Sequence, residues 1–155
     1  MAGIGELMVT EMVTATPYET VAAVARRMAR NRVGAILLVD KGDLWGLFSE
    51  RDLLTRVVHE NRDPNSIDVG AVATRNPVTV DIDAPVKQVL QIFREGKFRH
   101  LPVMRDGKPA GILSTRDFLE HLVDGLERYI EDMRYNRDLA AGIDPYDHVG
   151  GSYGR

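Results

Sequence analysis

The chain contains no cysteine among its 155 residues. This absence excludes disulfide bonds and thiolate chemistry, and it suits a reducing cytoplasm, which is the compartment we expect. No apolar run approaches the roughly 20 residues that a membrane span requires. The N-terminus has no basic start followed by an apolar stretch, so we expect neither a secretory signal nor membrane association.

An excess of basic residues is also missing, since 20 Lys and Arg stand against 23 Asp and Glu, for a net charge of −3. Proteins that bind nucleic acid neutralise phosphates with a basic surface, so a nucleic-acid partner is not expected. The sequence lacks a Walker-A loop and a strand-borne GxGxxG motif. Its four histidines show no metal-ligand spacing, and no adjacent residues form a catalytic set. We therefore predict a protein without a metal site that is not an enzyme.

An internal repeat determines the predicted fold. A shift of 65 residues aligns Val13–Leu54 with Val78–Leu119 without a gap. The identical positions fall on turns, core positions and one polar cluster. They are Val13/Val78, Thr14/Thr79, Val21/Val86, Val24/Val89, Gly42/Gly107, Gly46/Gly111, Ser49/Ser114, Arg51/Arg116, Asp52/Asp117 and Leu54/Leu119. Such self-similarity predicts two copies of one supersecondary unit.

Each copy is predicted to be a β-α-β-β-α unit. Thr16, Pro17 and Glu19 have the pattern of a helix start with a capping box, and Asp83–Pro85 has a less complete version of it. Apolar residues then recur at helical spacing. Two strands joined by a glycine-containing hairpin turn follow in each copy. These strands are 35–39 and 44–48 in the first copy, and 101–104 and 109–113 in the second.

The units are too small to be stable alone, so we expect them to pack as a pseudo-two-fold intramolecular pair of α+β class. The predicted organisation is a first repeat over 7–60, a polar linker over 61–68 and a second repeat over 69–123. A helical extension over 124–141 and a flexible tail over 142–155 complete the chain. The apolar stripe of the C-terminal helix is Leu122, Leu126, Tyr129, Ile130 and Met133.

One polar cluster, Gly-x-x-Ser-x-Arg-Asp, occurs in both copies where a strand passes into a helix. In a structural interpretation, Ser49 and Ser114 cap the helices, and Asp52 and Asp117 close the capping boxes. In a functional interpretation, the same helix starts attract a phosphate, and the aspartates accept hydrogen bonds from ribose hydroxyls. The two interpretations are compatible, because an anion can share the cap.

These motifs resemble a tandem pair of cystathionine β-synthase (CBS) domains, also called a Bateman module, over about Leu7–Val123. The most specific segments are Phe98–Val103 and Gly111–Asp117, matched in the first copy by Arg32–Val39 and Gly46–Asp52. The resemblance implies two tandem CBS repeats, β-α-β-β-α each, that form a flat, disc-shaped homodimer. It also implies AMP, ADP or ATP as ligand, bound in clefts between the repeats.

By position, the resemblance implies two nucleotide sites. In the first, Asp52 would bind the ribose and Ser49 and Arg51 the phosphate. In the second, Asp117 would bind the ribose and Ser114 and Arg116 the phosphate. The residues implied around adenine are Leu47, Val78 and Phe98 in the first site and Ile112, Val13 and Val33 in the second.

Arg99 and His100 occupy positions that often contact phosphates in the family. The first copy has Gly34 and Ala35 at the equivalent positions.

The function predicted first is a regulatory adenine-nucleotide sensor that modulates a partner protein through ligand-dependent conformational change. Nearly all of the sequence belongs to the sensor, so we expect the regulated partner to be a separate effector protein. Two alternatives remain open: a structural dimeric adaptor with degenerate pockets, or a module that binds NAD or S-adenosylmethionine. An unrecognised nucleotide hydrolase that uses Asp52 or Asp117 as a base ranks last.

Overall fold

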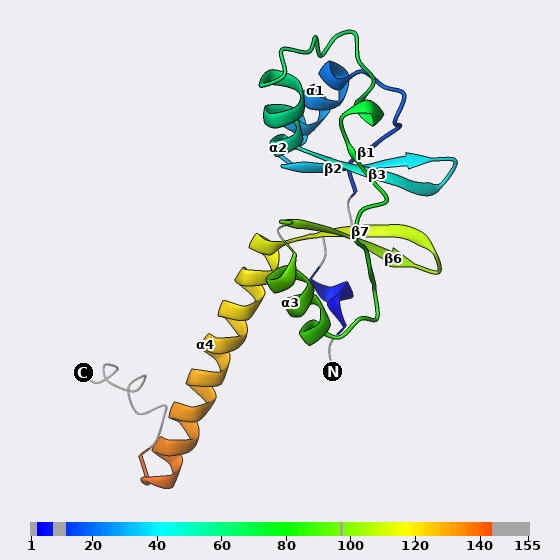
Figure 1. The fold of residues 1–155 in the computed structure, drawn as a ribbon. Helices are drawn as coiled ribbons and strands as arrows, with labels where there is room; N and C mark the ends of the chain where they lie inside the picture. Colours follow the sequence, from blue (N-terminus) through cyan, green and yellow to red (C-terminus); the bar gives the residue numbers. More distant parts are fainter. Residues whose placement is uncertain (1–2, 8–11, 97, 144–155) are drawn as a thin grey trace, which may run out of the picture. The chain divides into compact units, whose positions relative to one another are not determined.

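The computed structural model describes residues 3–7, 12–96 and 98–143, and it separates into two compact units that divide between Asp117 and Phe118. The first unit contains both repeats, each built on its own sheet (Figure 1). The second unit is made largely of the helix α4. This arrangement confirms the predicted mixed α+β class. Residues 144–155 of the expected tail lie outside the described residues.

The first repeat has a four-stranded sheet in the order β1-β2-β3-β4. Strand β1 is parallel to β2, whereas β3 is antiparallel to both of its neighbours. The elements are β1 Thr14–Ala15, α1 Val21–Asn31, β2 Ala35–Asp40, β3 Asp43–Ser49, α2 Glu50–Asp52, the π-helix η2 Leu53–Val58, the 3-10 helix η3 Val69–Ala71 and β4 Thr74–Arg75.

The second repeat has a three-stranded sheet in the order β5-β6-β7, with β5 parallel to β6 and β6 antiparallel to β7. Its elements are β5 Val80–Asp81, α3 Val86–Glu95, β6 His100–Arg105, β7 Lys108–Ser114 and the start of α4 Thr115–Ala140, while the short 3-10 helix η1 Ile4–Glu6 opens the chain. Both predicted hairpins are present. Lys41 and Gly42, like Asp106 and Gly107, have positive φ, as a two-residue type I′ turn requires.

Both helices that open the repeats begin later than the sequence pattern suggested. Helix α1 starts at Val21, and its cap is Thr20, whose hydroxyl accepts a hydrogen bond from the backbone N–H of Ala23 at 3.2 Å. Glu19 does accept a bond from the Thr16 N–H, but it also pairs with Arg27, which stabilises a turn before the helix. In the second repeat, Pro85 is itself the N-cap and makes no side-chain cap bond.

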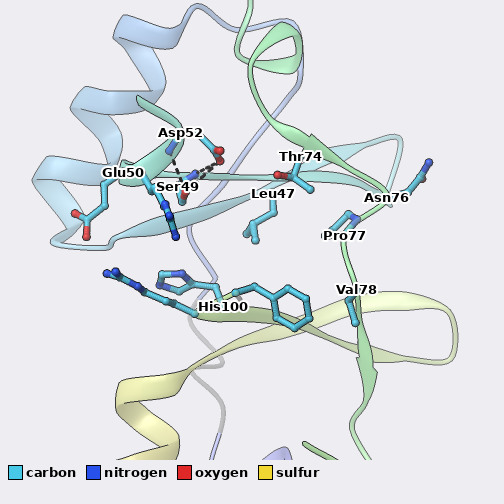
Figure 2. Close-up of a pocket in the computed structure, with 12 residues that line it drawn as sticks. Leu47, Ser49, Glu50, Asp52, Thr74, Asn76, Pro77, Val78 and His100 are labelled. Atoms are coloured by element: carbon cyan, nitrogen blue, oxygen red, sulfur yellow. Dashed lines mark hydrogen bonds between the residues drawn. The ribbon is translucent and has the colours of Figure 1, made fainter. Parts of the chain in front are cut away.

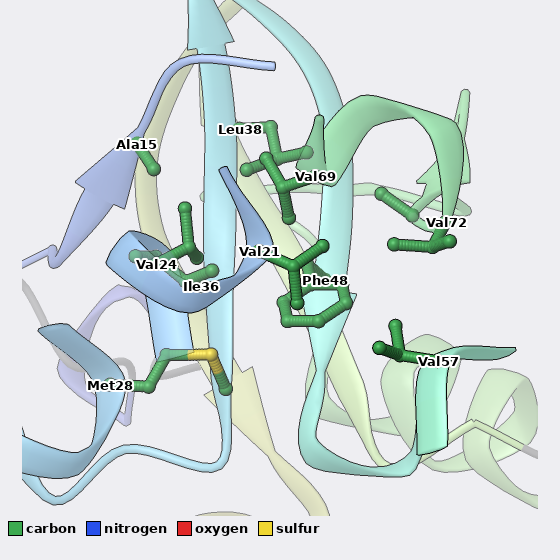
Figure 3. Close-up of a cluster of buried hydrophobic side chains, with 11 residues drawn as sticks. Ala15, Val21, Val24, Met28, Ile36, Leu38, Phe48, Val57, Val69 and Val72 are labelled. Atoms are coloured by element: carbon green, nitrogen blue, oxygen red, sulfur yellow. The ribbon is translucent and has the colours of Figure 1, made fainter. Parts of the chain in front are cut away.

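The core of the first repeat lies between α1 and the sheet (Figure 3). Ile36 and Leu38 on β2 point into this cluster, together with Phe48 of β3. Leu37 lies between them on the opposite face and is also buried, at 1% exposure. Because alternate residues of a strand point to opposite faces, both faces of β2 are covered. This agrees with the expectation that the paired repeats share their exposed sheet faces.

The segment at the beginning of each repeat packs against the other repeat. Val69 and Val72, which follow the expected linker, are fully buried in the core cluster of the first repeat. Strand β4 then pairs with β3, and its close approach depends on Gly46, where a Cβ would lie 2.6 Å from the carbonyl oxygen of Thr74. At the other end, Gly3 bridges to Pro85 of the second repeat. The two repeats are therefore interleaved.

The expected linker 61–68 is packed against α1 rather than free. The N–H of Val21 donates to the carbonyl of Ile67, and the N–H of Ala22 donates to that of Pro64. The Ile67 side chain also packs on the core cluster. Among the described residues, the helices are all too short or too polar to cross a bilayer.

We expect Phe48→Ala to lower the free energy of unfolding by about 3–5 kcal/mol, because it empties a fully buried ring position at the centre of the core. Leu54→Ala is the control, since Leu54 is 62% exposed and its truncation should change stability by less than about 0.5 kcal/mol. Urea unfolding followed through the single tryptophan, Trp45, measures both. Equal losses for the two variants would contradict this core assignment.

Candidate ligand-binding site

The two Ser-x-Arg-Asp motifs form the helix caps that the structural interpretation predicted. Ser49 caps α2, with its N–H donating to the Asp52 carboxylate at 3.0 Å and its hydroxyl accepting from the Asp52 N–H at 3.2 Å. In the second repeat, the Ser114 hydroxyl donates to Asp117 at 2.7 Å and accepts from its N–H at 3.1 Å. The repeated motif therefore has a structural role in both copies.

A matching pair of backbone hydrogen bonds anchors the loop that precedes each central strand. The N–H of Glu50 donates to the carbonyl of Gly34 at 2.9 Å, and the N–H of Thr115 donates to the carbonyl of Arg99 at 2.8 Å. These bonds hold residues 34 and 99 against the start of a helix. They also occupy an N–H group that the functional interpretation had reserved for phosphate, so less of the helix start remains available to an anion.

The described residues contain a cavity of about 310 Å³ between the repeats. The first repeat contributes its β3–α2 corner, the second contributes the start of β6, and the segment that joins β4 to β5 forms another wall. Figure 2 shows Asp52 and His100 at one end of the cavity and Pro77 and Val78 at the other. The lining residues are Leu47, Ser49, Glu50, Arg51, Asp52, Thr74, Asn76, Pro77, Val78, Phe98, Arg99 and His100.

Asp52 lies at the wall of this cavity with its side chain 14% exposed. One carboxylate oxygen accepts the bonds from Ser49, and the other lies 3.5 Å from Nε of Arg56. Arg56 also donates to the carbonyl of Ala73 at 3.1 Å, which ties the carboxylate to the segment before β4. Because an ionised carboxylate offers about four acceptor sites, Asp52 retains capacity for hydroxyl groups of a ligand.

Phe98 is positioned by its neighbour Gly96, because a Cβ at residue 96 would overlap the aromatic ring. The ring can therefore lie against the backbone at the end of α3 and line the cavity at the same time. Leu47, Pro77 and Val78 contribute further apolar surface, and Val78 is 49% exposed. This part of the cavity suits a flat, weakly polar group.

The polar end of the cavity carries charges of both signs. Arg51 and Arg99 are cationic and exposed, whereas Glu50 and Asp52 are anionic. Burial lowers the pKa of His100 below its ordinary value of 6.5, an effect that nearby Glu50 and Asp117 partly oppose and Arg99 reinforces. The imidazole is consequently neutral at neutral pH, and the two guanidinium groups supply the positive charge.

The residues predicted for the first site are brought together around one cavity, but those predicted for the second site do not line it. Val13 and Val33, expected beside a second base, are half-buried and pack against the core of the first repeat. Asp117 is held in its cap by Ser114, and the Arg116 side chain is exposed.

Sequence reasoning missed Glu50, Thr74, Asn76 and Pro77. The 65-residue shift pairs Asn76 and Pro77 with dissimilar residues, so the repeat gave no signal there.

Comparison with known proteins identifies the two repeats. The CBS domain family model matches residues 4–59 and again residues 69–124. The chain belongs to the CBS domain family. CBS pairs are regulatory, ligand-binding modules, and the fold described above is that of such a pair.

Three similar proteins illustrate the range of relatives. CBS domain-containing protein CBSCBSPB3 of Arabidopsis thaliana is 34% identical over 96% of this chain, which spans 26% of that protein's length. The CBS-domain containing protein ATU1752 from Agrobacterium tumefaciens has a TM-score of 0.71 at 28% identity, covering 77% of this chain and 98% of its own. PAE2072 from Pyrobaculum aerophilum, solved as a complex with AMP, has a TM-score of 0.69 at 30% identity, covering 74% and 88%.

The partly buried imidazole of His100 should make the stability of this CBS pair depend on pH. The pKa of His100 is lower in the folded chain than in the unfolded chain, so the unfolded state binds the proton more readily. The free energy of unfolding should therefore fall as the pH drops from neutrality through about 6.5 towards the lowered pKa.

Urea unfolding at a series of pH values from about 8 to 5 measures this dependence. His100→Gln should flatten it between pH 7 and the lowered pKa. His59→Gln, a substitution at an exposed histidine of the first repeat, is the matched control and should leave the dependence in place. An unchanged slope in His100→Gln would show that the pH dependence arises elsewhere.

Proposed function

We propose that this CBS pair binds an adenine nucleotide of the AMP, ADP or ATP type in the cavity between its repeats, and that occupancy modulates a partner protein. The observation that carries the proposal is the separation of chemistry within one cavity. Apolar side chains, including Phe98, gather at one end, and a carboxylate with two guanidinium groups lines the other. A nucleotide has the same division into a flat base, a hydroxylated sugar and an anionic phosphate.

Each part of the ligand has a proposed contact. The base would lie against Phe98, Leu47 and Val78, since aromatic and aliphatic surfaces favour a flat ring. The ribose hydroxyls would donate to Asp52, because hydrogen bonds to an ionised acceptor are the strongest that a sugar can make. Two N–H groups at the start of α2 already donate to Gly34 and Ser49, so the phosphate would depend mainly on Arg51 and Arg99. The Ser49 hydroxyl, which donates to Asp52 at 3.1 Å, would have to exchange that bond to reach the phosphate.

The proposed site is asymmetric between the repeats. Arg99 and His100 open β6 and line the cavity, whereas their counterparts in the first repeat are Gly34 and Ala35. A cleft on the Asp117 side would therefore lack the second guanidinium and the imidazole, and would keep only the guanidinium of Arg116. We propose that the cavity at Asp52 is the principal nucleotide site and that the Ser114, Arg116 and Asp117 set binds more weakly.

The proposed regulation follows from the fact that three different parts of the chain form the walls of the cavity. Residues from both repeats and from the segment between β4 and β5 line the same space, so a ligand contacts all three at once. A ligand shifts an equilibrium only by its difference in affinity for the two states. A nucleotide that bridges the repeats favours the arrangement in which all three walls reach it, and a partner that distinguishes the arrangements would sense it.

Calorimetric titration of the purified chain tests the function directly. AMP, ADP and ATP should bind with a stoichiometry near one per chain, and more tightly than NAD or S-adenosylmethionine. Preferred binding of either of the last two would transfer the proposal to that ligand. Absence of binding by all five at millimolar concentration would favour the structural adaptor instead. Release of phosphate during incubation with ATP would contradict a non-catalytic sensor.

We expect Asp52→Asn to raise the Kd for AMP by about 10- to 150-fold, because the change removes a charge-assisted acceptor worth about 1.5–3 kcal/mol. Asparagine keeps an oxygen that can accept from the Ser49 N–H, so the cap can persist. Asp117→Asn is the matched control, since it alters the equivalent capping box in the second repeat. Calorimetry should find a much smaller effect for it, and the reverse ranking would contradict the assignment of the principal site.

A variant that removes a guanidinium group should distinguish recognition of the phosphate from recognition of the nucleoside. Arg99→Gln should weaken AMP binding by about 10-fold or more, because a charge-assisted contact to phosphate is lost, and leave adenosine binding nearly unchanged. Arg26→Gln, on the exposed side of α1, is the control and should alter neither. Equal weakening of AMP and adenosine by Arg99→Gln would indicate that Arg99 supports the pocket shape rather than the phosphate.

A further inference from the structure

Helix α4 carries a continuous apolar stripe along its exposed length. From residue 119 to 140, the helix has exposed side chains at every position except His121 and Asp138, which are intermediate. The exposed fractions in the stripe range from 39% at Leu122 to 60% at Leu119 and Tyr129. The exposed apolar members of the stripe are Leu119, Leu122, Val123, Leu126, Tyr129, Ile130 and Met133. An apolar face of this length on a helix is normally covered by a partner.

The spacing of the stripe is that of a coiled-coil seam. Starting at Leu119, the positions 119, 122, 126, 129, 133, 136 and 140 alternate in steps of three and four, so they occupy the a and d positions of three successive heptads and the first a position of a fourth. Helices in proteins are stabilised mainly by packing of their amphipathic face rather than by intrinsic propensity. Gly125 in the middle of α4 lowers that propensity further. The helix therefore benefits from a partner along this seam.

We propose that the occupant of this seam is α4 of a second copy of the chain, and that the two helices form a parallel, in-register coiled coil over residues 119–140. This inference is independent of the nucleotide proposal, because it concerns only the unit that begins at Phe118. It assigns a role to the helical extension as the element that brings two CBS pairs together.

Charge complementarity identifies a second copy in parallel orientation. In the heptad assignment, Asp132 is at a g position and Arg137 is at the following e position. In a parallel pair, each g residue faces the e residue of the next heptad on the partner, so Asp132 of one copy meets Arg137 of the other, twice per dimer. The Arg137 side chain is 75% exposed, and its own-chain contact with Asp138 is a long one of 3.4 Å.

Two further positions agree with this register. Asn136 is at d and would face its own copy, where one amide can donate and the other accept. An antiparallel pairing would place it against an apolar residue. Gly125 is at g, and a Cβ there would meet nothing within 4 Å, which leaves open space on the flank of the seam. Ile130 at the following e position is the side chain that a parallel partner would direct towards that space.

Disulfide cross-linking of the full chain tests the seam, because the natural sequence contains no cysteine and each introduced one is unique. Under mild oxidation, Met133→Cys at an a position should form a covalent dimer in high yield. Arg134→Cys, one residue along on the outer face, is the matched control and should form at least about 10-fold less. Equal yields, or no dimer from Met133→Cys, would overturn the proposal. An antiparallel or intrachain packing of α4 would give the second of these results.

Substitutions in the seam and at the charged pair give a second measurement. Leu126→Glu should reduce cross-linking through residue 133 about 10-fold or more, whereas Arg128→Glu on the outer face should not. Asp132→Lys and Arg137→Glu should each reduce the yield, and the double variant should restore it, because the charges are then exchanged but still opposite. Failure of the double variant to restore the yield would overturn the parallel register.

Discussion

The burial of Val69 and Val72 in the core of the first repeat is the contact on which the arrangement of the module depends. These residues follow the linker in sequence, yet they pack with Phe48 and Val57 in the same cluster. Fully burying a valine side chain contributes about 1.5–3 kcal/mol, so this pair adds substantially to a domain of marginal stability. With Gly3 bridging to Pro85 at the other end, each repeat is completed by chain that belongs to its neighbour.

This interleaving fixes the position of the cavity. Once Val72 is buried and β4 is paired with β3, the chain must leave the first sheet and reach β5 of the second within a few residues. Asn76 turns it there with a φ of 49°, a left-handed conformation that asparagine tolerates better than most residues. The short connection through Pro77 and Val78 consequently becomes a wall of the space between the sheets.

The sequence was informative wherever a local rule acts alone. Short apolar runs, glycine hairpins and the Ser–Asp caps are all local, and the structure confirms β2, β3, β6, β7 and both caps within a residue or two. The start of α1 was placed too early because Glu19 satisfies a turn before the helix by pairing with Arg27. Strand β4 and the Arg56 contact with Asp52 depend on non-local pairing, which the repeat pattern does not encode.

The same separation of local and non-local effects explains how one scaffold can carry different side chains at equivalent positions of its two repeats. The bonds from Glu50 to Gly34 and from Thr115 to Arg99 are made by backbone atoms, so they form whatever side chain residues 34 and 99 carry. The two repeats therefore make the same backbone bond although residue 34 is a glycine and residue 99 is an arginine. Charge at the cleft is set by the side chain alone. A change there alters the charge at that position while the backbone bond is kept, which allows the two repeats to keep one architecture while differing in chemistry.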